Sequence, residues 1–195
     1  MRPDVPSIEF FFDIASPYSY LASHRIDAVG ARVGLPVRWR PFLLGGVFKA
    51  TGNEMPVRVP ARGAYLLRDL DRWAERLELP FQFPSFFPCN SLIPMRALTW
   101  LPEEERREAA QRVFHAHWAE ARNPQDLELL AELLGRQPVV GAGEPEVKAR
   151  LRQTTDEAVA RGAFGAPSIF VGDQLFFGND RMELVEDAAR KLAAR

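Results

Sequence analysis

The pattern of apolar positions is typical of strands at the two ends of the chain and of helices between them. Residues 8–12 form an apolar run with aromatic and β-branched side chains, which predicts a short strand buried on both faces. Residues 37–42 alternate between apolar and polar side chains and predict a second strand. A helix lies between them, so we expect a β-α-β unit with parallel strands and a right-handed crossover.

The helix of this unit begins at a Ser-Pro pair. Ser16 is a favourable N-cap residue, and Pro17 suits the first helical position because the N–H of that position has no partner within the helix. Apolar positions then recur at helical spacing as far as the turn at 34–36, namely at Tyr20, Leu21, His24 and Ala28. Because a helix N-terminus favours an anion, Ser16 has two interpretations: it caps the helix only, or its hydroxyl also holds a thiolate or another anion.

The C-terminal part is again typical of an α/β unit. Residues 168–172 and 174–177 predict two antiparallel strands joined by a tight hairpin turn at Gly172-Asp173. A last helix opens at residues 178–180. Its expected inner face carries Leu184, Ala188 and Leu192.

The middle of the chain predicts one long loop and then helices. Residues 45–60 are rich in glycine and proline, which indicates an irregular loop of the kind that is usually functional or disordered. Residues 81–88 hold too much proline for a central strand and predict an extended aromatic segment. The first expected helix starts at residue 61 and ends before Pro80. Further helices are expected at about 91–101, 103–121, 125–134 and 145–163. We expect no pair of strands inside 61–140.

A β-α-β half joined to a β-β-α half is the plan of the thioredoxin fold. We therefore predict an α/β, thioredoxin-like fold with a large all-helical insertion. The thioredoxin-like domain consists of residues 1–44 and 164–195, with the helix at 145–163 packing on it. Residues 45–163 form the helical insertion domain.

Composition narrows the class of protein. The chain has 195 residues, of which 47% are hydrophobic and 26% are charged, as in ordinary globular proteins. The net charge of −1 gives no electrostatic case for nucleic acid or an anionic membrane, and no apolar stretch reaches the roughly 20 residues that span a bilayer. Residues 1–4 lead directly into the first strand, so we expect no signal peptide. A single cysteine, Cys89, excludes an internal disulfide and favours a cytoplasmic protein.

Two segments near the C-terminus contain candidate ligand-binding residues. A proline at the position of Pro167 in a thioredoxin-like fold is usually cis, which leaves the backbone of Ala166 unpaired by the sheet and free to bond an extended peptide ligand. We expect this backbone to face the Ser16 end of the first helix. Asn179 and Asp180 either cap the last helix or hold the carboxylate and ammonium groups of a ligand, and the residues leave both interpretations open.

The remaining candidate groups do not predict a metal site. His115 and His117 are two positions apart on a helix and point to different faces. Cys89 lacks a C-x-x-C partner, and its apolar neighbours are expected to raise the pKa of the thiol and leave it inert.

Five motifs in order along nearly the whole chain carry a resemblance to a known family. They are Phe12-Asp13 with Ser16-Pro17-Tyr18-Ser19-Tyr20, Lys49-Ala50-Thr51-Gly52-Asn53, Val59-Pro60-Ala61-Arg62-Gly63-Ala64-Tyr65, Phe164-Gly165-Ala166-Pro167, and Phe177-Gly178-Asn179-Asp180-Arg181-Met182. Together they resemble the kappa-class glutathione transferase and 2-hydroxychromene-2-carboxylate isomerase family, in the DsbA-like branch of the thioredoxin superfamily.

The resemblance implies a glutathione-dependent isomerase that interconverts 2-hydroxychromene-2-carboxylate and trans-o-hydroxybenzylidenepyruvate. Its cofactor would be glutathione, its substrate a small aromatic hydroxy or keto acid, and its assembly a homodimer. The alternatives are a kappa-class glutathione transferase and a non-catalytic module that binds glutathione or a peptide. A dithiol oxidoreductase is disfavoured because Ser16 and Ser19 stand at the positions of its two cysteines.

The same resemblance implies the site residues. Ser16 is the catalytic residue and contacts the glutathione sulfur. Asn53 lies near the glycine end of glutathione, Ala166 pairs with the cysteinyl backbone, and Asn179 and Asp180 lie at the γ-glutamyl end. Further implied contacts come from Pro17, Tyr18, Pro167 and Arg62, the last of which stands where many relatives have lysine.

Overall fold

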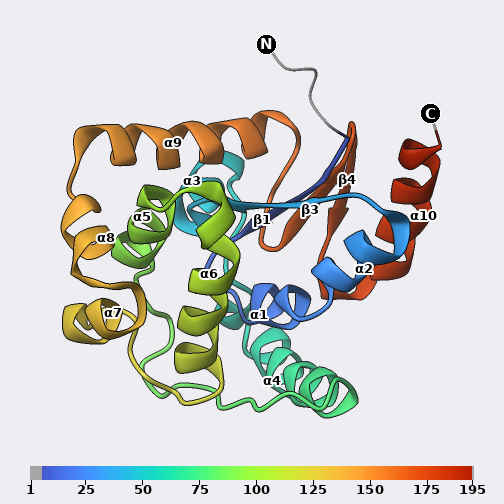
Figure 1. Ribbon diagram of the computed structural model, residues 1–195. Helices are drawn as coiled ribbons and strands as arrows, with labels where there is room; N and C mark the ends of the chain where they lie inside the picture. The colour runs from blue at the N-terminus through green and yellow to red at the C-terminus, as the bar shows by residue number, and fades with distance from the viewer. Residues whose placement is uncertain (1–5, 195) are drawn as a thin grey trace.

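The computed structural model describes residues 6–194 and contains a four-stranded sheet with the strand order β2-β1-β3-β4 (Figure 1). β1 pairs in parallel with β2 and antiparallel with β3, which in turn pairs antiparallel with β4. The β-α-β half, the hairpin and the thioredoxin-like plan are therefore confirmed. The expectation for residues 1–4 lies outside the described residues. The strands are β1 (Ile8–Phe12), β2 (Val37–Pro41), β3 (Ser168–Val171) and β4 (Gln174–Phe177).

Helices make up most of the rest of the chain, and within residues 6–194 no strand falls between positions 61 and 140, as predicted. None of the helices in this described range is long and apolar enough to cross a bilayer. The helices are α1 (Pro17–Ser23), α2 (Ile26–Val33), α3 (Leu44–Thr51), α4 (Pro60–Arg76), α5 (Leu92–Trp100), α6 (Glu103–Trp118), α7 (Leu127–Leu134), α8 (Arg136–Gly141), α9 (Pro145–Ala160) and α10 (Met182–Ala193), with short 3-10 helices η1 (Pro56–Arg58) and η2 (Asn179–Arg181).

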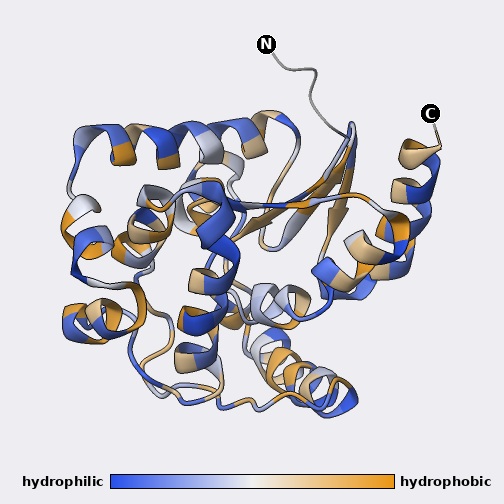
Figure 2. Ribbon diagram, in the orientation of Figure 1, coloured by the Kyte–Doolittle hydropathy of each residue, from blue (hydrophilic) through white to orange (hydrophobic). Residues whose placement is uncertain are grey.

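The side chains of β1 alternate between the two faces of the sheet, and both faces are covered. Phe10 and Phe12 pack edge-on against Trp39 on the face covered by α1, α2, α6 and α10. Phe11 packs against Phe170 on the opposite face, under α3 and α9. In Figure 2 the strands are mostly apolar, whereas α6 and α9 carry many hydrophilic residues on the outside. This burial explains why the sequence of β1 is apolar at nearly every position.

The apolar core on the first face continues into the predicted helical insertion. Leu70 of α4, Met95 of α5 and Phe114 of α6 are fully buried in the same cluster as the strand residues. Trp118, at the end of α6, is fully buried and donates its indole N–H to the carbonyl oxygen of Ile14 at 2.8 Å. The helical segment thus packs directly against the first strand and helix, while its assignment as a separate domain stays a prediction.

The predicted loop at 45–60 is wrong in its first half, where the chain forms α3. Gly45 and Gly46 have a low intrinsic helix propensity, which argues against a helix on local grounds. Two tertiary interactions outweigh that propensity. The N–H of Leu44 donates to the buried carboxylate of Asp13 at 2.7 Å, and Val47 is fully buried against the sheet.

The single helix predicted after Ser16 is interrupted, so α1 and α2 are separate helices. His24 and Ala28, which we expected on the apolar face, are exposed. Arg25 lies at the junction, and its guanidinium donates to the carbonyl oxygen of Asn179 at 2.8 Å. The break turns this side chain toward the segment that precedes the last helix.

The last helix begins later than predicted, and its expected inner face is confirmed at Ala188, which is buried, and at Leu192, which packs against the core. The 3-10 turn η2 comes first, so that α10 begins only at Met182. Met182 and Val185 are buried, whereas Leu184, which we expected on the inner face, is 52% exposed. A second unpredicted feature is α8, a short helix after Gly135.

Candidate functional site

Ser16 stands at the junction between β1 and α1. Its backbone is extended (φ −95°, ψ 114°), and its hydroxyl oxygen accepts the N–H of Ser19 at 3.1 Å. Pro17 occupies the first helical position, and Ser16 is 4% exposed. The capping interpretation is confirmed by this geometry, while the role in holding an anion stays a prediction.

The backbone of Ala166 lies against the same hydroxyl. The Ala166-Pro167 peptide bond is cis, and the Ser16 hydroxyl donates to the Ala166 carbonyl oxygen at 2.9 Å. The prediction that these two segments meet is therefore confirmed across a sequence separation of 150 residues. The Ala166 carbonyl oxygen thus already accepts one hydrogen bond in the protein, which the sequence did not predict, and its second lone pair leaves the expected bond to a ligand a prediction.

Asn53 follows α3 and connects it to the segment that leads into β3. Its amide nitrogen donates to the carbonyl oxygen of Phe164 at 2.8 Å, and its amide oxygen accepts the N–H of Glu54 at 2.8 Å. Phe164 is two residues before Ala166, so Asn53 and Ala166 border the same stretch of backbone. The side chain of Asn53 is exposed.

The turn η2, which carries Asn179 and Asp180, packs against α1. Asn179 is 2% exposed, and within the described chain its side-chain nitrogen is buried without a hydrogen-bond partner. Asp180 is exposed and forms an ion pair with Arg181. Before this turn, Gly178 has φ +101°, a conformation that favours glycine.

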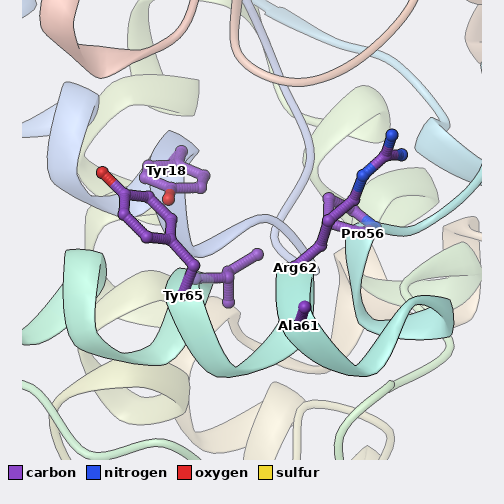
Figure 3. A pocket seen from close by; sticks show the side chains of 6 residues that line it. Tyr18, Pro56, Ala61, Arg62 and Tyr65 are labelled. Atoms are coloured by element: carbon purple, nitrogen blue, oxygen red, sulfur yellow. The ribbon is translucent and has the colours of Figure 1, made fainter.

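A pocket of about 410 Å³ opens beside the first turn of α1. Figure 3 shows Tyr18 and Tyr65 at one end of it and Arg62 beside Pro56 at the other. Arg62 is exposed and forms no ion pair with any described residue. The pocket lies between α1 on one side and α4 with η1 on the other, and its lining consists of Tyr18, Pro56, Ala61, Arg62, Tyr65 and Leu66.

The phenol of Tyr18 is fixed by a residue that sequence reasoning missed. Its hydroxyl donates to Oδ2 of Asp69 on α4 at 2.7 Å. Burial, followed by this hydrogen bond, raises the pKa of Tyr18 above its ordinary value, so the phenol is protonated at neutral pH. Asp69 sits on the polar face of a predicted surface helix, and no local pattern distinguishes it from its neighbours.

Asp13 is the second residue that sequence reasoning missed. Its carboxylate is fully buried and accepts the N–H groups of Ala15 at 2.9 Å and of Leu44 at 2.7 Å. It also hydrogen-bonds to Ser91. Asp13 therefore connects the turn before Ser16 to the start of α3. Burial raises the pKa of Asp13 above its ordinary value, opposed by these three hydrogen bonds.

We expect the unfolding free energy of wild type minus that of an Asp13→Asn variant to be largest at low pH and to decrease as pH rises. A raised pKa means that the folded protein binds more protons than the unfolded chain between the unfolded pKa of about 3.8 and the higher folded pKa. The unfolding free energy of wild type therefore falls across that window, whereas asparagine does not titrate. Urea unfolding of both proteins at a series of pH values measures the difference. A difference that grows with pH would contradict the direction of this shift.

Cys89 and His117 contact each other in the buried core. The Cys89 sulfur contacts Nε2 of buried His117 at 3.4 Å, and burial raises the pKa of the thiol to about 12 and lowers that of His117 to about 4. The thiol is thus protonated at neutral pH, in the direction the sequence predicted. His115 is exposed beside Glu120. Within residues 6–194, no group of three or more His, Cys, Asp or Glu side chains is arranged to hold a metal ion.

Comparison with known proteins shows which family this chain resembles in sequence and structure. The family model of the DSBA-like thioredoxin domain matches residues 7–190. A 2-hydroxychromene-2-carboxylate isomerase from Sphingobium xenophagum is 31% identical over 92% of this chain and 96% of its own. Glutathione S-transferase kappa 1 from Homo sapiens is 31% identical over 95% of this chain and 91% of its own. A solved structure of a 2-hydroxychromene-2-carboxylate isomerase superimposes with a TM-score of 0.83 at 29% identity, covering 95% of each chain.

Proposed function

Because the chain belongs to the DSBA-like thioredoxin domain family, among the 2-hydroxychromene-2-carboxylate isomerases and kappa-class glutathione transferases, we propose that it is a glutathione-dependent isomerase. Its proposed substrate is 2-hydroxychromene-2-carboxylate or a related small aromatic acid, which it interconverts with the trans-benzylidenepyruvate. We further propose that it acts as a cytoplasmic homodimer.

The observation that carries this proposal is the contact between Ser16 and Ala166. A serine hydroxyl at a helix N-terminus and the backbone next to a cis proline lie 2.9 Å apart. The first can donate a hydrogen bond to a thiolate, and the second can pair with the backbone of a cysteinyl peptide. A peptide thiol such as glutathione uses both groups at once.

The surrounding residues fit the rest of glutathione. The buried side-chain nitrogen of Asn179 has no acceptor among the described residues, and a carboxylate or carbonyl of the γ-glutamyl group would supply one. Arg62 offers a guanidinium without an ion-pair partner in the described chain to a carboxylate, and Asn53 borders the same stretch of backbone as Ala166. Pro17, Tyr18, Pro167 and Asp180 complete the proposed contacts.

When bound, glutathione supplies a thiolate that adds reversibly to the conjugated system of the substrate, so that rotation about a carbon–carbon bond proceeds with no net change in atoms or electrons. Ser16 donates a hydrogen bond to this sulfur and favours its anionic form. The N-terminus of α1 contributes partial positive charge. The pocket beside Tyr18 positions the aromatic acid.

We expect a calorimetric titration to show one glutathione bound per chain, and the loaded protein to turn over 2-hydroxychromene-2-carboxylate. Reaction with an activated chloroarene, in which the sulfur forms a carbon–sulfur bond and chloride leaves, reports transferase activity in the same preparation. A protein that binds glutathione but turns over neither compound would be the non-catalytic module. Absence of glutathione binding would overturn the whole proposal.

A further inference from the structure

A single side-chain hydrogen bond joins α4 to another element of the described structure. It is the bond from the Tyr18 hydroxyl on α1 to Oδ2 of Asp69, at 2.7 Å. α4 is also held by its packing against η1, by the buried side chains Leu66, Leu70 and Ala74, and by the guanidinium of Arg25 over the ring of Trp73 at 5.6 Å. Most of the remaining surface of α4 is exposed.

The donor of this hydrogen bond, Tyr18, lines the pocket that lies between α1 and α4. Tyr18 forms one wall, and Ala61, Arg62, Tyr65 and Leu66 of α4 form the other. Figure 3 shows the rings of Tyr18 and Tyr65 near each other. Asp69 lies one helical turn after Tyr65, so its hydrogen bond holds the phenol of Tyr18 on this side of α4. The bond therefore fixes both the position of an aromatic wall and the distance of α4 from the first turn of α1.

We propose that Asp69 is a positioning residue, which through Tyr18 sets the width of this pocket and so selects planar aromatic second substrates. The proposal rests on the proposed function for the chemistry of the second substrate. Asp69 is not among the residues that line the pocket, and within the described chain it forms no hydrogen bond or ion pair with a proposed glutathione residue other than Tyr18. Asp69 therefore acts on the position of the Tyr18 ring and on the width of the pocket, and makes no contact with the substrate itself.

Three variants separate this role from a general effect on α4. Asp69→Ala removes the acceptor and releases the phenol, whereas Asp69→Asn keeps a side-chain oxygen that can accept the same hydrogen bond. Asp71→Ala is the matched control, because Asp71 is an exposed acid on the same helix with no hydrogen bond or ion pair within the described chain.

The first measurement is hydrogen exchange of the α4 backbone amides in the free protein, which requires no ligand. We expect exchange over residues 61–70 to be about 5-fold faster in Asp69→Ala than in wild type, and unchanged in Asp69→Asn and Asp71→Ala. Equal exchange in wild type and Asp69→Ala would overturn the positioning role. This result does not depend on whether the protein binds glutathione.

The second measurement compares KM and kcat for 2-hydroxychromene-2-carboxylate at saturating glutathione. We expect Asp69→Ala to raise KM about 5-fold to 10-fold with kcat within about 2-fold of wild type, and Asp69→Asn to restore KM. The same rise in Asp71→Ala, or a loss confined to kcat, would overturn the selection of substrate by pocket width. If wild type has no turnover with this acid or with an activated chloroarene, the proposed function and the substrate selection both fail, and the exchange result alone decides the positioning role.

Discussion

Glutathione bound to a Ser16→Ala variant is expected to titrate about one pKa unit higher than glutathione bound to wild type. A free thiol has a pKa of about 8.5, so only a few per cent is thiolate at neutral pH. A charge-assisted hydrogen bond from Ser16 contributes about 1.5–3 kcal/mol in favour of the anion, and each pKa unit corresponds to about 1.4 kcal/mol. Taken alone, this bond lowers the pKa of the bound thiol by about one to two units.

The contact with Ala166 sets the expected shift near the lower end of that range. The Ser16 hydroxyl has one proton, and in the free protein it donates this proton to the Ala166 carbonyl at 2.9 Å. Donation to a thiolate requires the proton to leave that carbonyl, which costs about 1 kcal/mol unless a ligand N–H replaces it. Glutathione affinity at low pH should change little in the variant, because only the anion uses the new bond.

Thiolate absorbance followed against pH in both proteins measures this shift. Ser16→Ala also loses the cap on the Ser19 N–H, which destabilises α1 by about 1 kcal/mol. Asp126→Ala is a matched control, since Asp126 caps α7 by accepting the N–H of Glu128 at 2.9 Å and takes no part in the proposed site. The control should lose similar stability with an unchanged thiol titration. Overlapping titrations for wild type and Ser16→Ala would make Ser16 a cap only.

A Trp118→Ala variant is expected to lose about 3–5 kcal/mol of unfolding free energy. Trp118 is fully buried, packs against the rings of Phe81, Phe83 and Phe87, and donates to the carbonyl oxygen of Ile14. Its removal leaves a large cavity and an unpaired buried carbonyl at the junction of β1 with α1. Because one core contains both strand residues and residues of the helical insertion, we expect the Trp118→Ala variant to unfold in a single cooperative transition.

Urea unfolding followed by circular dichroism and by intrinsic fluorescence checks this expectation. Trp118→Phe keeps most of the ring volume and isolates the lost hydrogen bond, worth about 1–3 kcal/mol at a buried site. Trp100→Phe is its control, since the indole of Trp100 donates to the exposed carboxylate of Glu144 and its loss should cost less than about 1 kcal/mol. Two separate transitions in wild type would instead favour an independently folding helical insertion.

The sequence by itself determined the elements whose stability is local. Alternation and apolar runs identified the strands at the two ends of the chain, and the Gly172-Asp173 turn identified the hairpin. Ser16 and Pro17 predicted the start of α1, because N-capping depends on residues within one turn of each other. The order of these elements was sufficient to predict a thioredoxin-like fold.

Tertiary structure alone decided the features that depend on contacts between distant residues. The helix α3 forms despite Gly45 and Gly46 because the buried carboxylate of Asp13 caps Leu44, a partner that lies 31 residues away. The bond from Tyr18 to Asp69 spans 51 residues, and that from Ser16 to Ala166 spans 150. Hydrophobic periodicity records which face of a helix or strand is buried, but not which polar side chain meets which backbone group across the core. The direction of the Ser16 proton, on which the proposed chemistry depends, is therefore a property of the folded chain.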